Sequence, residues 1–358
     1  MRAFASFGFC KAHAAAFALP TYQSAWLKTH HTAAFIAGIL THDPGMYPKR
    51  LLLDEARQWG IVIAPIDINI SDLTYRVERT RVATRTPYVA PNLASTGELL
   101  SLPDARGYAI RVSLADVAGI SETEISSIIA GQPYVDLADF TYRSGVSHPT
   151  AEALVMIGAF DDLHRVKEKN INRRDLLLHL HDLYRLSGSK TKSIQNQMTF
   201  RLAPPELHSS GLPDLTANEQ VRYELDLLGM DISGHRLEFY WDFLNSIGAV
   251  RSSDLITHRS GSSVLVAGVK VALQTPPMRS GKRVMFVTLD DGFGCNDATF
   301  FDDAQKDYAA TIRNSSLLLV QGEIRRTGPR GISIRATGAW DLQASYETSY
   351  EKRGVNVE

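Results

Sequence analysis

The feature that most constrains the fold of this 358-residue chain is a change of residue pattern near residue 263. From there to residue 342, apolar and polar residues alternate in short runs, with glycines at positions 281, 292 and 331 between some of them. Alternation with a period of two is typical of strands, and glycine allows tight turns. The runs are Val264–Val271, Arg283–Leu289, Asp297–Phe301, Ser316–Glu323 and Ile332–Thr337. Five such strands predict a small β-barrel.

The sequence before the barrel is mostly helical in pattern. Residues 4–78 are alanine-rich and periodic, and Pro20 is expected to break or kink the first stretch. A helix is predicted over Lys49–Trp59, ending at Gly60, with short strands near residues 61–63 and 75–78. Residues 80–105 have no periodicity and are interpreted as a linker. The sequence indicates no internal repeat, and its length favours two or three domains.

Composition excludes several classes of protein. The chain has 38 basic and 39 acidic residues, so a nucleic-acid partner would have to be held by local basic patches. Its two cysteines, Cys10 and Cys295, exclude a disulfide framework and a cysteine-based zinc site. No stretch approaches the roughly 20 apolar residues of a membrane span. We therefore expect a cytoplasmic protein without a membrane partner.

A helix-hairpin-helix pattern is centred on Gly119, Ile120 and Ser121, with apolar residues at helical spacing on both sides. Backbone N–H groups at the start of the second helix of such a motif can hold a phosphate. Ser121 stands where a second glycine is usual. A companion unit is predicted at residues 146–160, ending with Gly158–Asp161. A plain helical hairpin explains either half alone, but two consecutive units favour binding to the DNA backbone.

The strand-turn pattern of residues 284–294 is that of oligonucleotide-binding (OB) folds, which hold single strands with basic and aromatic side chains. The predicted DNA contacts are Lys282, Arg283, Arg325, Arg326 and Arg330. Further candidates are Lys270, Arg279 and Arg335 for charge, and Phe286, Phe300 and Phe301 for stacking. Alternation buries about half of the side chains of any strand, so each phenylalanine is as readily explained as core. Asp290–Asp291 and Asp302–Asp303 are interpreted as solvated turn residues, and no metal is assigned to them.

The N-terminal residues carry a specific resemblance. Residues 7–17, Phe-Gly-Phe-Cys-Lys-Ala-His-Ala-Ala-Ala-Phe, and residues 22–28 closely resemble the fingers motif of family C DNA polymerases, the alpha subunits of bacterial DNA polymerase III. The match extends through residues 45–48, 65–69, 158–161 and 228–231 and the barrel. Residues 42–50 and 274–281 are more similar to the error-prone, damage-inducible paralogue than to the main replicase.

The resemblance implies a multi-domain α+β protein with a helical fingers segment, a tandem helix-hairpin-helix domain and a C-terminal five-stranded OB-type barrel. The expected parts are fingers over 1–80, a linker over 81–105, the hairpin domain over 106–165, a helical connector with a polar linker over 166–262, the OB domain over 263–342 and a frayed tail over 343–358.

The implied chemistry is nucleotidyl transfer, with two metal ions held by aspartates of the palm. In this family those aspartates precede the fingers motif, and the sequence has no Asp-x-Asp motif. We therefore expect a fragment with no catalytic residue and no metal of its own, and Mg²⁺ only in the complete polymerase. By resemblance, Lys11 and His13 face the phosphates of the incoming nucleotide and Phe17 its base or sugar. The alternative places His13 and Phe17 in the core.

The implied partners are DNA, as template-primer duplex and single strand, and a dNTP in the complete enzyme. Gln195, Met198 and Phe200 resemble the short peptide that docks on bacterial sliding clamps, although an ordinary polar linker explains them equally well. An adaptor encoded with the mutagenesis cassette is a further candidate partner.

Three hypotheses remain open on the sequence. The leading one is part of an error-prone DNA polymerase for translesion synthesis, DNA repair and replication. The second is a free-standing, non-catalytic module of hairpin and OB type that binds nucleic acid. The third is a remnant without function, in which Tyr22, Trp26 and Ile36 lack the palm that normally covers them.

Overall fold

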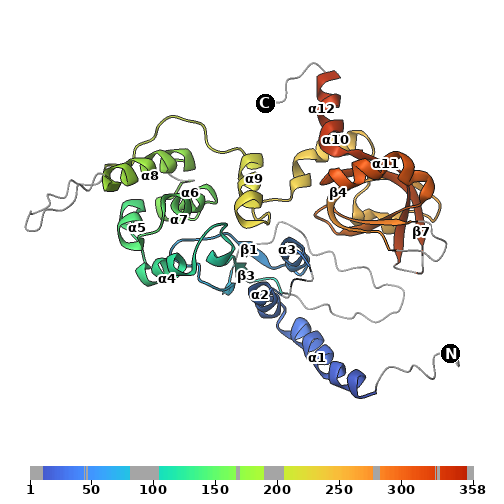
Figure 1. The fold of residues 1–358 in the computed structure, drawn as a ribbon, viewed down its shortest axis with the longest axis horizontal. Coiled ribbons are helices and arrows are strands. Elements are labelled where there is room, and N and C mark those ends of the chain that lie inside the picture. Colours follow the sequence, from blue (N-terminus) through green and yellow to red (C-terminus); the bar gives the residue numbers. More distant parts are fainter. Residues whose placement is uncertain are drawn as a thin grey trace, which may run out of the picture. The chain divides into compact units, whose positions relative to one another are not determined.

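The chain forms two units, each with its own hydrophobic core, in a computed structural model (Figure 1). The units are Met1–Ser233 and Gly234–Glu358, and each is described by itself. The structure describes residues 11–43, 45, 47–80, 105–166, 170–188, 205–276, 283–326, 328 and 331–352.

Three helices open the first unit. The first, α1 (Lys11–His30), runs through Pro20 as one element, so of the predicted break or kink the break is absent. Proline removes one helical hydrogen bond, and the alanines around it are strong helix formers that tolerate the loss. Helices α2 (Thr32–His42) and α3 (Lys49–Gln58) follow. As predicted, Gly60 follows the end of α3, with a φ of +81° that favours glycine.

A three-stranded sheet packs beside these helices. Its strands are β1 (Val62–Ala64), β2 (Arg76–Arg79) and β3 (Tyr108–Arg111), in the order β1-β3-β2. Strand β3 is parallel to β1 and antiparallel to β2. The first two strands lie where the sequence predicted them, but β3 was not predicted. The sheet therefore joins residues that precede and follow the stretch interpreted as a linker.

The rest of the first unit is helical. Its elements are η2 (Leu114–Asp116), α4 (Glu122–Gly131), α5 (Leu137–Ser144), α6 (His148–Met156), α7 (Asp161–His164), α8 (Arg173–Gly188) and α9 (Ala217–Leu228). Phe140 lies at the centre of this region, with edge-to-face contacts to Tyr134 and Phe160 at 5.1 and 4.9 Å between ring centroids. These rings and the buried apolar residues of α2 belong to one core.

Two side-chain amides fasten the segment after β1 to the segment after α4. Asn69 donates to the carbonyl of Tyr134 at 3.0 Å and accepts from its N–H at 2.7 Å. Gln132 donates to the carbonyls of Ile68 and Ser71 at 2.8 and 3.0 Å. The sheet and the hairpin helices are therefore held together by specific hydrogen bonds as well as by apolar packing.

The second unit is the predicted barrel with short helices around it. The barrel closes in the order β4-β5-β6-β8-β7. Its elements are η3 (Arg236–Tyr240), α10 (Trp241–Ser246), η4 (Ser252–Thr257), β4 (Ser263–Gln274), β5 (Met285–Asp290), β6 (Cys295–Phe300), α11 (Asp302–Asn314), β7 (Leu317–Arg326), β8 (Ile332–Asp341) and α12 (Leu342–Lys352). The frayed tail predicted from residue 343 is wrong as far as residue 352, because this stretch forms α12.

The barrel interior follows the alternation predicted for its strands. Val287, Leu289, Ala298, Phe300 and Ile334 are all fully buried. In β4, Gly268 lets the facing strand come close, since a Cβ there would lie 2.7 Å from the Cβ of Leu289. Among the described residues, no helix is long and apolar enough to cross a membrane.

Candidate nucleic-acid interface

The first hairpin turn lies where it was predicted. Gly119, Ile120 and Ser121 join η2 to α4, and Gly119 has a φ of +80° with open space where a Cβ would point. Gly119 and Ser121 are exposed, and Ile120 is half-buried. The Ser121 hydroxyl caps α4 by accepting from the N–H of Glu124 at 3.3 Å. These residues form a solvent-facing turn at a helix N-terminus, the usual place for a phosphate contact.

The second hairpin turn starts earlier than predicted. Gly145, Val146 and Ser147 join α5 to α6, and they repeat the order glycine, apolar residue, serine of the first turn. Gly145 has a φ of +64°, and the Ser147 hydroxyl caps α6 by accepting from the N–H of Thr150 at 3.4 Å. The unit predicted from the sequence covers residues 146–160, without an internal repeat. The repeated Gly-apolar-Ser triplet is the signal that would have located it.

The turn formed by Gly158, Ala159 and Phe160 is buried instead of exposed. Its Ala159 carbonyl accepts from the N–H of Ile68 at 2.9 Å. Arg173 lies against it and binds the carboxylate of Asp161 at 2.7 Å. This turn therefore belongs to the core of the first unit and offers no surface to a nucleic acid.

A single carboxylate connects the two exposed hairpin turns. Glu124 accepts from the N–H of Ser121 at 3.0 Å and from the N–H of Ser147 at 2.9 Å. The hydroxyls of Ser121 and Thr150 add bonds at 2.9 and 3.0 Å. Burial opposes ionisation, but the hydrogen bonds outweigh it and lower the pKa of Glu124 to about 2. Two N–H groups that a phosphate would use are thus already bound to an anion of the chain.

The outer face of the barrel presents an exposed aromatic ring beside cations. Phe286 on β5 is 39% exposed and lies opposite Thr299 on β6, which lies opposite Arg335 on β8. The guanidinium carbons of Arg335 and Arg325 are 5.6 and 5.9 Å from the centroid of the Phe301 ring. Bases stack on exposed rings and phosphates bind arginine, so this face has the chemistry that a single strand requires.

The predicted basic residues of the barrel have different surroundings. Arg283 and Arg325 are exposed, at the start of the β5 region and near the end of β7. Arg326 is also exposed, but its guanidinium donates to the carbonyls of Ile256 and His258, so it helps to fix the end of η4. Lys282 and Arg330 lie outside the described residues.

The three candidate stacking residues differ in their exposure to solvent. Phe300 is 0% exposed and belongs to the barrel core, so the interpretation of Phe300 as a stacking residue is wrong. Phe286 points outward, and Phe301 is half-buried just before α11. The alternation of β6 turns Phe300 inward.

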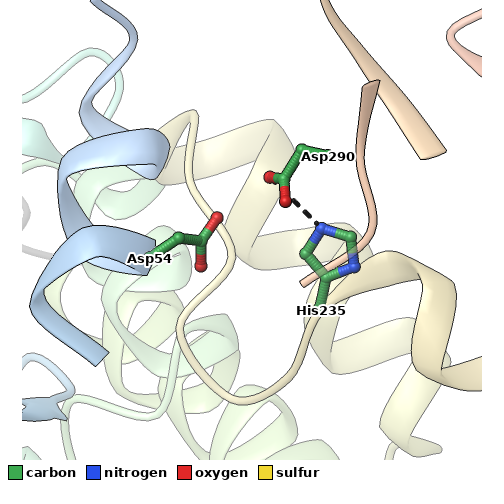
Figure 2. A group of neighbouring side chains, drawn as sticks. All are labelled: Asp54, His235 and Asp290. Atoms are coloured by element: carbon green, nitrogen blue, oxygen red, sulfur yellow. Dashed lines mark ion pairs between the residues drawn. The ribbon is translucent and has the colours of Figure 1, made fainter. Parts of the chain in front are cut away.

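Asp290 and Asp291 are not the solvated turn residues that the sequence predicted, since each is 1% exposed. In Figure 2, the Nε2 atom of His235 lies 3.5 Å from Asp290 Oδ2. The other ring nitrogen of His235 accepts from the N–H of Leu237 at 3.2 Å. Asp54, also drawn there, belongs to the first unit, where it pairs with Arg57. The Asp290–His235 pair anchors the start of η3 to the end of β5.

The candidate nucleotide contacts lie on α1. His13 and Phe17 are exposed, with ring centroids 4.6 Å apart, so neither is a core residue within the described structure. Lys11 begins α1, and its side chain lies outside the described part. Tyr22 and Trp26 are 70% and 45% exposed.

Two further predictions have separate outcomes. Ile36, which the remnant hypothesis expected to be exposed, is buried in the core of the first unit. The clamp-binding candidates Gln195, Met198 and Phe200 lie outside the described residues.

Two family models match the chain. The first, described as a helix-hairpin-helix motif, covers residues 60–176, and the second, an OB-fold nucleic acid binding domain, covers residues 264–342. The first match includes both hairpin turns, and the second includes all of the barrel except Ser263. Both assignments agree with the fold predicted from the sequence.

Curated relatives match most of the chain. An error-prone DNA polymerase of Symbiobacterium thermophilum is 32% identical over 87% of this chain and 30% of its own length. One from Bdellovibrio bacteriovorus is 29% identical over 91% of this chain and 29% of its own length. The DNA polymerase III subunit alpha of Haemophilus influenzae is 27% identical over 90% of this chain and 26% of its own length. The chain therefore spans less than a third of the length of these relatives.

Proposed function

This chain is a homologue of bacterial error-prone DNA polymerases and DNA polymerase III alpha subunits, and from that premise we propose that it is the DNA-handling part of an error-prone polymerase acting in translesion synthesis and repair. Its own task is to hold single-stranded template on the barrel and duplex near the hairpin turns, through groups other than the N–H groups of Ser121 and Ser147, which Glu124 occupies. The nucleotidyl transfer itself belongs to a part of the polymerase that carries the catalytic aspartates.

The observation that carries this proposal is the outward face of the barrel. The ring of Phe286 on β5 is exposed, whereas a core residue would be buried. Arg335 lies on the same face, two strands away on β8. Arg325 and Phe301 continue the patch. A face made of rings and guanidinium groups binds unpaired bases and their phosphates with little sequence preference, which suits a polymerase template.

The buried carboxylates of the barrel do not fit a pair of catalytic metal ions. Asp291 already accepts bonds from the backbone and hydroxyl of Ser252, both at 2.6 Å, and from the N–H groups of Phe293 and Gly294 at 3.0 and 3.1 Å. Asp290 is held by His235 and by the N–H of Gly292. In a complete polymerase, Mg²⁺ would activate the primer hydroxyl and stabilise the leaving phosphate, at residues other than these.

Nucleotide binding is assigned to α1 within the same proposal. The exposed rings of His13 and Phe17 project from one side of the helix, and Lys11 precedes them. Their solvent exposure suits contact with a nucleotide that is bound mainly by the catalytic part. Gln195, Met198 and Phe200 remain the proposed sliding-clamp contacts, and a mutagenesis-cassette adaptor remains a proposed partner.

The proposal is tested by measuring how the full chain binds a fluorescent single-stranded oligonucleotide. Phe286→Leu keeps the bulk but removes the aromatic face, and Arg335→Gln removes the charge. Stacking contributes about 1–3 kcal/mol per base, so we expect Phe286→Leu to weaken binding about tenfold. Lys306→Gln, on the exposed side of α11, is the matched charge control and should bind like the wild type. Wild-type affinity in both barrel-face variants would refute the proposal.

The second candidate is a free-standing module without a catalytic partner. It is favoured by the fact that both family models that match the chain describe nucleic-acid-binding or hairpin folds. Joining the chain to the remaining part of a relative distinguishes the two. Template-dependent incorporation by the joined protein supports the polymerase, and DNA binding without incorporation supports the module.

A further inference from the structure

An arginine contacts two adjoining aromatic rings at one end of the barrel. The guanidinium carbon of Arg251 lies 4.7 Å from the ring of Trp241 and 4.5 Å from the ring of Phe293. The two rings meet edge to face, with centroids 5.8 Å apart. Stacked in this way, a guanidinium loses little hydration and keeps the N–H groups at its edge available for an anion.

The position of this group is fixed by a neighbouring carboxylate. Asp291 accepts from the N–H and hydroxyl of Ser252, the residue after Arg251, and from the N–H of Phe293. The same aspartate therefore holds the arginine segment and the β5–β6 turn against each other. Gly292 tightens that turn, because a Cβ at its position would lie 2.9 Å from the ring of His235. The rings and the guanidinium are thus preorganised before any ligand arrives.

The group has unused binding capacity. Within the described part of the chain, no carboxylate forms an ion pair with Arg251, and the nearby Asp291 is saturated by other donors. Trp241 is 8% exposed, whereas Phe293 is 38% exposed. An arginine that only shielded Trp241 would not require contact with a second, solvent-exposed ring. An exposed ring beside a preorganised cation matches one nucleotide: a base for the ring and a phosphate for the guanidinium.

We propose that Arg251 and Phe293 form a second contact for single-stranded nucleic acid, in which Phe293 stacks on a base and Arg251 binds the adjoining phosphate. This inference rests on the proposed function, because it extends the same bound strand. Phe286 lies near the start of β5 and Phe293 in the turn after its end, and Phe286 to Asp290 alone spans roughly 13 Å at the rise of a strand. A strand that reaches both rings is held at two separate points, which limits its sliding along the barrel.

The test compares variants of the full chain for binding to an oligonucleotide and to the same oligonucleotide with abasic sites. Phe293→Leu should weaken binding of the normal oligonucleotide about tenfold and change binding of the abasic one little. Arg251→Gln should weaken both and reduce the slope of log affinity against log salt by about 0.7, the value for one lost phosphate contact. Arg251→Lys keeps the charge but not the planar stacking group. Its affinity for the oligonucleotide should lie between those of the wild type and Arg251→Gln.

Arg259→Gln is the matched control, since Arg259 is an exposed arginine on the same connecting segment. Near-ultraviolet circular dichroism establishes that the Phe293→Leu and Arg251→Lys variants keep the native packing. If these folded variants bind with wild-type affinity while Phe286→Leu still weakens binding, the inference about Arg251 and Phe293 is overturned. The proposed function then stands without this second contact. Equal displacement of the oligonucleotide by polyglutamate would also overturn it, because Arg251 would then be a site for acidic peptides.

Discussion

Glu124 offers a test of how the two hairpin turns are held together. Its carboxylate accepts four hydrogen bonds, two from the N–H groups of Ser121 and Ser147 and two from hydroxyls. Replacing it with glutamine turns one oxygen into an NH₂ group that faces donors. Glu124→Gln therefore loses at least two of these bonds and leaves an N–H group of one turn without an acceptor.

The magnitude follows from the lowered pKa. The pKa of Glu124 falls from 4.5 to about 2, and each unit corresponds to 1.36 kcal/mol, which gives an upper limit of about 3 kcal/mol. The side chain is partly exposed, so solvent screening reduces the expected loss to about 1–2 kcal/mol. Because the folded pKa is depressed, this stability is present above pH 4.5 and is lost as the pH falls toward 2.

The assay is urea unfolding of the full chain at pH 7 and at pH 3, followed by a probe in the first unit. The free energy of unfolding of the wild type should fall between pH 7 and pH 3 as the contribution of Glu124 is lost. The Glu124→Gln variant should lack this part of the pH dependence. Glu122→Gln is the control, since Glu122 is exposed in the same helical turn. An equal loss of stability in both variants, or no loss in Glu124→Gln, would refute the role assigned to this carboxylate.

Three further predictions concern residues that position the interface. Asn69→Ala should destabilise the first unit by about 2 kcal/mol through its two bonds to Tyr134, measured by urea unfolding, and a change within 0.5 kcal/mol would contradict it. Phe300→Ala should cost the second unit about 3–5 kcal/mol by leaving a cavity in the barrel, and a soluble variant with wild-type melting would show that Phe300 is not core. Asp291→Ala should loosen the β5–β6 turn, so that hydrogen exchange at the Phe293 and Gly294 amides rises at least tenfold, and unchanged protection would contradict the role of Asp291.

The barrel could be predicted from the sequence because its signal is local. Alternation along β5 and β6 decides which side chains point inward, and it separates Phe286 from Phe300 once the register is known. The register itself depends on pairing between strands, which the sequence does not contain, so the two rings could not be told apart in advance.

Other features depend on contacts between distant residues. Asp290 and Asp291 follow a strand, where acidic residues are usually solvated, and only the packing of His235 and Ser252 against them makes them buried. Strand β3 has four residues and is defined by its partners β1 and β2. By contrast, the second hairpin turn has a local signal, the repeated Gly-apolar-Ser triplet at Gly145, which locates it without any long-range contact.

The most direct test of DNA handling by this chain is a salt titration of single-stranded oligonucleotide binding by the full 358-residue protein. We predict saturable binding at low salt, with log affinity falling linearly against log salt by about 0.7 for each phosphate contacted. Phe286→Leu should weaken that binding while leaving the slope unchanged, because a ring contributes stacking and no charge. Absence of binding at low salt, or an affinity that does not respond to salt, would contradict a role in holding DNA.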